Sequence, residues 1–138
     1  MSNALKKVLI IFVLLFCTLT TGCDKEKPFV VLNSQAINSK TIYNPIYNYT
    51  PHQKINYVVV KQQGFTDSVL RIQILKQDDK VSNWGFSLAG SDNICVDKGA
   101  KFYIGYIAAP PMPGRYCIRF FELNDLDNEI ARASFWVN

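Results

Sequence analysis

The sequence has little of what catalysis or metal binding requires. It contains one histidine, His52, and its seven glycines are isolated, so no glycine-rich loop that could bind phosphate is present. No serine stands in a G-x-S-x-G motif, and a Ser/His/Asp or Cys/His set would have to use His52, which lies in a proline-bearing loop. The sequence therefore predicts a protein that is not an enzyme and that holds no cofactor and no metal ion.

Charge is also sparse. Charged residues make up 19% of the 138 residues and hydrophobic residues 49%, with a net charge of +4. The lysines and arginines are scattered along the chain, whereas counterion release from nucleic acid requires several of them on one face. This composition predicts one globular domain that does not bind nucleic acid.

The chain has one long hydrophobic run, from Val8 to Leu19, preceded by Lys6 and Lys7. About a dozen apolar residues are too few to cross a bilayer core of about 30 Å, and they fit the apolar region of a signal peptide. We therefore expect a signal-peptide helix within 1–22, a short tether over 23–28 and a folded domain over 29–138.

The segment Leu19-Thr20-Thr21-Gly22-Cys23 resembles the lipobox of bacterial lipoproteins. The resemblance implies that Cys23 carries diacylglycerol, becomes the first mature residue and anchors the protein to a membrane of the cell envelope. Ordinary secretory cleavage, giving a soluble exported protein, is the alternative. The charged residues after Cys23 are compatible with inner-membrane retention and with surface export, so the leaflet stays open.

From Phe29 onward, short β-branched and aromatic runs recur about every ten residues and no helical periodicity is present. This pattern predicts an all-β domain of about seven or eight strands, arranged as a β-sandwich. The expected strands are 29–32, 55–61, 68–76, 93–96, 102–108, 115–123 and 129–137.

The C-terminal part carries a second resemblance. Pro113-Gly114 precedes the alternating pattern Tyr116-x-Ile118-x-Phe120, and a polar connection at 124–128 leads to the last strand. This arrangement is similar to the last two strands of immunoglobulin-like and fibronectin-like modules, which implies an antiparallel immunoglobulin-like sandwich. The Cys…Trp…Cys pattern of antibody domains is absent, because Trp84 precedes both cysteines of the domain.

Two cysteines fall within the predicted domain, Cys95 and Cys117. Both lie in predicted strands of a protein exported to an oxidising compartment, so we expect a Cys95–Cys117 disulfide. The alternative is a redox-active or metal-binding pair, although the spacing matches neither C-x-x-C nor a common zinc pattern.

Acidic residues gather near the last hairpin, at Glu122, Asp125, Asp127 and Glu129. Alternating carboxylates suit Ca²⁺, but polar hairpin turns are often rich in Asp and Asn for backbone reasons alone. The run lacks the spacing of a known calcium loop, so no metal site is assigned to it, and whether it binds calcium stays open.

Aromatic residues provide the candidate binding surface. The segment 40–52 contains two prolines and three tyrosines, which predicts a long connection or an edge segment. Tyr43, Tyr47 and Tyr49, with Phe121 on the non-core side of its strand, are the candidate ligand or partner surface. The alternative is that the tyrosines cap one end of the sandwich.

These features favour a non-catalytic binding or structural module of the cell envelope. Its partner would be another envelope protein or cell-wall glycan, bound through loops or an exposed sheet edge. The alternative is a carbohydrate-binding module that uses the tyrosines and Trp84.

Overall fold

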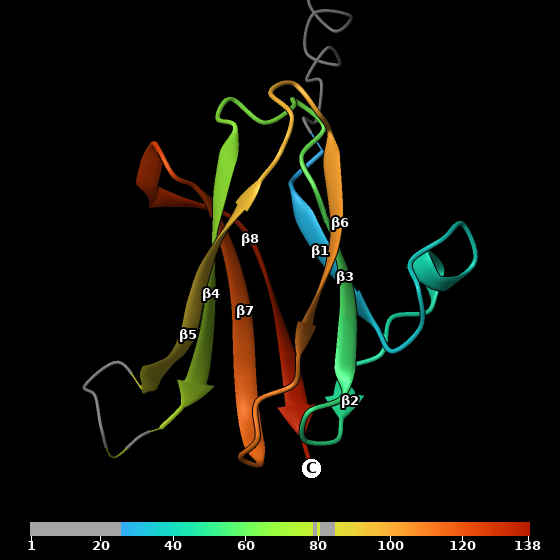
Figure 1. The fold of residues 1–138 in the computed structure, drawn as a ribbon, viewed down its shortest axis with the longest axis vertical. Coiled ribbons are helices and arrows are strands. Elements are labelled where there is room, and N and C mark those ends of the chain that lie inside the picture. Colours follow the sequence, from blue (N-terminus) through green and yellow to red (C-terminus); the bar gives the residue numbers. More distant parts are fainter. Residues whose placement is uncertain (1–25, 79, 81–84) are drawn as a thin grey trace, which may run out of the picture.

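The computed structural model describes residues 26–78, 80 and 85–138, and strands are almost the only regular secondary structure among them (Figure 1). The elements are β1 (Phe29–Asn33), the short 3-10 helix η1 (Thr41–Tyr43), β2 (Asn48–Tyr49), β3 (Lys54–Val60), β4 (Val69–Gln77), β5 (Phe86–Cys95), β6 (Phe102–Ala108), β7 (Gly114–Glu122) and β8 (Asp125–Val137). The prediction of an all-β domain is confirmed.

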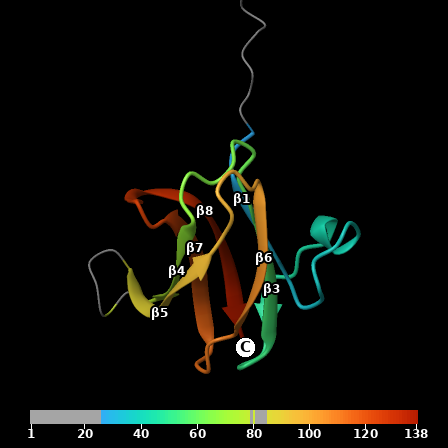
Figure 2. The same ribbon diagram turned by 45° about the horizontal axis from the view of Figure 1, so that its top comes forward.

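The strands form two sheets that face each other (Figures 1 and 2). One sheet has three strands in the order β1-β3-β6, and the other has five in the order β2-β8-β7-β4-β5. Neighbouring strands are antiparallel except for β2, which pairs in parallel with the end of β8. The predicted sandwich is therefore confirmed, with one parallel pair in place of a wholly antiparallel arrangement.

Residues at every second position fill the space between the sheets, as the alternating sequence pattern requires. Their side chains form one continuous core to which β3, β7 and β8 contribute most of the large members. These include Ile55, Tyr57, Val59, Tyr116, Ile118, Phe120, Phe135 and Val137.

The strand order corresponds to an immunoglobulin-like sandwich. In that arrangement one sheet has the order A-B-E-D and the other contains C, F and G, with an added strand beside C in variable-type domains. Here β1, β3 and β6 take the places of A, B and E, while β4, β7 and β8 take those of C, F and G. Within the part of the chain that the structure describes, no strand stands in the place of D beside β6.

Tyr116, near the start of β7, adds a second immunoglobulin-like feature. Its hydroxyl donates a hydrogen bond of 2.6 Å to the backbone carbonyl of Met112, four residues upstream. Its ring stacks on Phe135, with ring centroids 5.6 Å apart. This is the geometry of a tyrosine corner, which fixes the loop that leads into strand F.

Tyr116→Phe is expected to lower the free energy of unfolding by about 1 kcal/mol, because one partly buried hydrogen bond is lost while the stacked ring stays. Urea denaturation followed by fluorescence would measure the change. Tyr43→Phe removes a hydroxyl from a side chain that is 83% exposed and serves as the control. Equal stability of the wild type and Tyr116→Phe would contradict a stabilising role for this hydrogen bond.

All seven expected strands overlap observed ones, and β6 agrees at both ends. Two boundaries differ by more than one residue. β5 begins at Phe86 rather than Asn93, and the connection expected over 124–128 is a tight turn at Leu123 and Asn124, so that β8 begins at Asp125. The segment 40–52 contains η1 and one strand, the two-residue β2, which lies at the edge of its sheet as predicted.

Candidate functional site

The outer face of the three-stranded sheet carries a row of exposed apolar side chains. Phe102, Ile104 and Tyr106 of β6 point away from the core and are 58%, 48% and 67% exposed, respectively. We call these three residues the β6 row. The strand register places Phe102 beside Val60 and Ile104 beside Val58, both of which are buried. Contiguous apolar surface of this kind marks interaction sites more often than single exposed side chains do.

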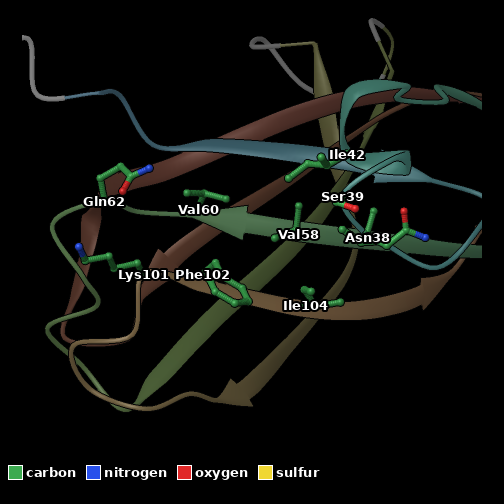
Figure 3. Close-up of a pocket in the computed structure, with 10 residues that line it drawn as sticks. Asn38, Ser39, Ile42, Val58, Val60, Gln62, Lys101, Phe102 and Ile104 are labelled. Atoms are coloured by element: carbon green, nitrogen blue, oxygen red, sulfur yellow. The ribbon is translucent and has the colours of Figure 1, made fainter.

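A groove of about 450 Å³ runs over this face (Figure 3). Val58 and Val60 of β3 lie along its middle, between Ile42 on one side and the side chains of β6 on the other. Polar groups stand only toward its ends. The lining consists of Ile37, Asn38, Ser39, Ile42, Val58, Val60, Gln62, Lys101, Phe102 and Ile104.

One wall of the groove belongs to the segment between β1 and β2, which projects beyond the three-stranded sheet (Figures 1 and 2). Asn33, at the end of β1, holds this segment in place although only 2% of it is exposed. Its side-chain amide donates to the carbonyls of Thr41, at 3.1 Å, and Asn44, at 2.8 Å, and its oxygen accepts from the N–H of Gln35. The groove wall is thus tied to the sandwich by a buried side chain.

A second opening, of about 370 Å³, lies between the two sheets at the side where β5 and β6 are the edge strands. Its apolar lining comes mainly from Ile72, Ile74, Ile94 and Ile107, and Asp92 is the acidic residue in it. Among the described residues, no group of three or more histidine, cysteine or acidic side chains could hold a metal ion. The opening offers apolar space and no pair of carboxylates.

Gly105 of β6 pairs with Tyr57 beside this opening. A Cβ atom at residue 105 would lie 2.5 Å from the Tyr57 hydroxyl oxygen and 2.9 Å from the Tyr103 ring. Glycine is therefore required here for close approach of the backbone to Tyr57, which is almost fully buried.

The aromatic residues that the sequence pattern grouped as one surface lie apart from one another in the structure. Tyr43 and Tyr47 are exposed, but Tyr49 is in the core, where its ring meets that of Phe135 edge-on at 6.0 Å between centroids. Phe121 is 4% exposed on the outer face of the other sheet, under the Arg119 guanidinium. The prediction of a shared platform is wrong, because β2 pairs with β8 and turns Tyr49 inward.

The predicted disulfide is also wrong, since Cys95 and Cys117 are both free thiols. Cys95 pairs with Val69 at one end of β4, and Cys117 pairs with Leu75 near the other end. Six residues of strand separate the two positions by about 20 Å, far more than a disulfide spans.

We expect the two thiols to differ in reactivity. Cys95 is exposed, whereas Cys117 is buried and its burial raises the pKa of the thiol. Brief iodoacetamide treatment of the folded protein, read by peptide mass spectrometry, should alkylate Cys95 alone, and urea should then expose Cys117. Recovery of a Cys95–Cys117 peptide from unreduced protein would contradict the structure.

Glu122 and Glu129, the two least exposed of the acidic residues near the last hairpin, make separate interactions. Glu122 is buried and accepts hydrogen bonds from the N–H and hydroxyl of Thr66. Glu129 forms ion pairs of 2.6 Å with Arg119 and with Arg132. These two carboxylates bind different neighbouring residues and share no partner.

His52 is exposed in the turn that precedes β3 and has a positive φ of 65°. Its backbone N–H donates to the carbonyl of Ala109 at 3.0 Å. Histidine is among the residues that adopt this backbone region more readily than most. A structural role in this turn therefore accounts for the presence of histidine at residue 52.

Several sequence predictions concern residues outside the described ranges. They are the signal peptide, Cys23 with its lipid, and Trp84 as a carbohydrate contact. Within the described residues, no helix is long and apolar enough to cross a membrane.

Sequence reasoning missed the β6 row as a surface, although it placed the strand correctly. The available signal was that the run Phe102–Ala108 is apolar or glycine at all of its seven positions, so both faces of the strand carry apolar side chains. A strand with one face in water normally alternates apolar and polar residues.

Comparison with known proteins gives no family. No family model matches the sequence, and no curated protein does. Among solved structures, the chain is similar to the β-glucosidase from Kluyveromyces marxianus in complex with glucose, at 14% identity and a TM-score of 0.39. The match covers 62% of this chain and 12% of the β-glucosidase chain.

Proposed function

We propose that the protein is a lipid-anchored, exported binding module of the bacterial cell envelope, with no catalytic activity of its own, and that it binds another envelope protein. The observation that carries this proposal is the β6 row, three large apolar side chains exposed along one edge strand. An apolar surface over a regular strand suits a protein partner, because protein interfaces use aromatic and aliphatic side chains as anchors.

The lipidated Cys23 of the proposal would place this surface close to the membrane. Phe29, the first residue of β1, is six residues after Cys23, so a fully extended tether spans about 20 Å. The strand register puts Phe29, Val60 and Phe102 side by side across the sheet. In the proposed arrangement the end of the β6 row at Phe102 would lie on the membrane side, within reach of other proteins in the same layer.

The carbohydrate-binding alternative depended on a flat platform of tyrosines. Tyr49 is a core residue, and Tyr43 and Tyr47 lie on the projecting segment before β2. No observation on the described residues favours sugar binding over protein binding.

Ile104→Asp tests the proposal, because a charge in the centre of the β6 row opposes burial against an apolar partner surface. Chemical cross-linking in the native envelope should recover a discrete protein with the wild type, with at least a tenfold loss in Ile104→Asp. Leu88→Asp is the matched control, since Leu88 is 60% exposed on β5, the edge strand of the other sheet. Equal recovery with both variants, at unchanged thermal stability, would overturn the proposed site.

A further inference from the structure

β6 is an open edge of the three-stranded sheet. It pairs with β3 along one side over all of its residues, from Phe102 to Ala108. On its other side, where an immunoglobulin-like sandwich has strand D, the described residues provide no strand. The backbone N–H and C=O groups on this side of β6 therefore point away from the sheet and can pair with another chain.

The other sheet edges are protected in ways that β6 is not. β1 has five residues and β2 has two. β5 carries Asp92, and its pairing with β4 shifts register between Ile74 and Leu75. β6 pairs in one unbroken register over seven residues and contains no charged residue and no proline. Short length, charge and bulges are the devices that keep edges from pairing, and β6 has none of them.

The space beside this edge also fits a strand. The opening of about 370 Å³ between β5 and β6 lies where inward side chains of an added strand would point. Ile72, Ile74 and Ile94 line it from the five-stranded sheet. On the outer face, the added strand's remaining side chains would lie beside the β6 row.

We propose that an extended segment of the partner protein adds as a strand to the free edge of β6, in the place of strand D. This inference rests on the proposed function and specifies its partner as a β-forming segment whose inward residues are small and apolar. Main-chain hydrogen bonds to β6 supply affinity, and the side chains in the opening supply selectivity.

The charge of the outer face indicates which residues the outward side of that segment should carry. Lys54 lies over the Tyr106 ring, with its Nζ 4.4 Å from the ring centroid, and Lys101 directly precedes β6. The outward residues of β1, β3 and β6 include no acidic side chain. A partner segment with acidic outward residues near its two ends complements these two lysines.

A second copy of this chain does not fit the same edge. Antiparallel pairing of two β6 strands would place the copies head to tail, with the β1 ends pointing in opposite directions. With the Phe102 end of β6 on the membrane side, as proposed above, a tether of six residues from Cys23 to Phe29 would bring the lipid of only one copy to that membrane. Parallel pairing would require one copy to be turned over, so that the apolar outer faces of the two copies would lie on opposite sides of the joined sheet.

The chain's own N-terminal end does not fit either. It enters the sheet at β1, and β3 separates β1 from β6. In the lipidated protein of the proposed function, cleavage before Cys23 would leave only three residues ahead of Glu26, too few to lie along seven residues of β6. The occupant is therefore a segment of a different protein.

Site-specific photo-cross-linking tests the inference. p-Benzoylphenylalanine would replace Phe102, Ile104 or Tyr106, one at a time, in the full chain in its native envelope, with Leu88 as the control position. Residues 102 and 106 are about 13 Å apart along β6. Cross-links from these two positions should fall about four residues apart on one partner segment, with that of residue 104 between them.

Other outcomes separate the inference from the proposed function. A displacement of about nine residues would indicate a helix lying along the groove, because a helix rises 1.5 Å per residue. That result, or cross-links scattered over several segments, would overturn strand addition and leave the binding function standing. Cross-links to a second copy would overturn the assignment to a different protein. Cross-links to lipid alone, or to nothing, would overturn both proposals.

Backbone pairing is then tested with a synthetic peptide of the cross-linked segment. Methyl groups on alternate backbone nitrogens that face β6 should weaken binding to the full chain at least tenfold, since they remove main-chain hydrogen bonds. The same number of methyl groups on the other alternate nitrogens is the matched control and should leave affinity within about threefold. Equal effects of both peptides would overturn strand addition.

Discussion

Glu122→Ala is expected to lower the free energy of unfolding at pH 7 by about 3 kcal/mol, because it removes a buried carboxylate that several donors share. Oε1 of Glu122 accepts from the Thr66 N–H, and Oε2 accepts from the Thr66 hydroxyl at 2.6 Å and from Lys61 Nζ at 3.1 Å. Glu122 ends β7 in one sheet, whereas Lys61 directly follows β3 in the other. The substitution therefore breaks a tie between the two sheets. Urea denaturation would measure the loss.

The contribution of Glu122 depends on pH with a defined sign. Burial alone would raise the pKa of Glu122, but the hydrogen bonds from Thr66 and the charge of Lys61 outweigh it and lower the pKa below its ordinary value of 4.5. A lowered pKa in the folded protein means that the stabilisation is complete above pH 4.5 and declines as the pH falls through the lowered pKa. The stability difference between the wild type and Glu122→Gln should therefore shrink in acid.

Asp127→Ala is the control for both measurements, because Asp127 is an exposed acidic residue of the same hairpin. We expect its stability to stay within about 0.5 kcal/mol of the wild type at pH 7. A loss in Glu122→Ala no larger than that of the control would show that the carboxylate does not tie the sheets. A Glu122→Gln difference that stays constant down to pH 2.5 would contradict the pKa assignment.

The local sequence pattern was enough to predict most strands, because alternating apolar residues and β-branched side chains directly indicate a strand that is buried on one face. β6 is apolar throughout and was placed at both ends, Phe102 and Ala108. β5 was predicted only over its last residues, because the residues before them include Ser87, Gly90 and Ser91. Those residues form a strand because they pair with β4, and local β-strand preferences do not reveal that pairing.

The candidate site could not be predicted because it depends on which strands become neighbours. Tyr47 and Tyr49 are only two residues apart, yet Tyr49 alone is buried, because it pairs in β8 with Val137, a core residue. Cys95 and Cys117 both lie in strands, but β4 stands between their strands and holds them near its opposite ends. Long-range register decides such contacts, and a single sequence contains no direct signal of register.

Two phenylalanines, Phe120 and Phe102, allow a contribution to folding stability to be distinguished from a contribution to partner binding. Phe120 is fully buried, and its ring contacts Tyr57 at 5.1 Å between centroids. Phe120→Ala should therefore lower the free energy of unfolding by about 3–5 kcal/mol, because the core closes only in part over the lost ring. Phe102 is more than half exposed in the β6 row, so Phe102→Ala should change stability by no more than about 0.5 kcal/mol.

The same pair of variants should give the opposite order in the binding measurement. Partner cross-linking in the native envelope, normalised to folded protein, should fall at least fivefold in Phe102→Ala, because a row residue that adds little to folding is free to bury its ring against a partner. Folded molecules of Phe120→Ala keep the β6 row and should cross-link normally. If Phe102→Ala were as destabilised as Phe120→Ala, or cross-linked like the wild type, the row would be a structural part of the sandwich and its assignment as a binding surface would be wrong.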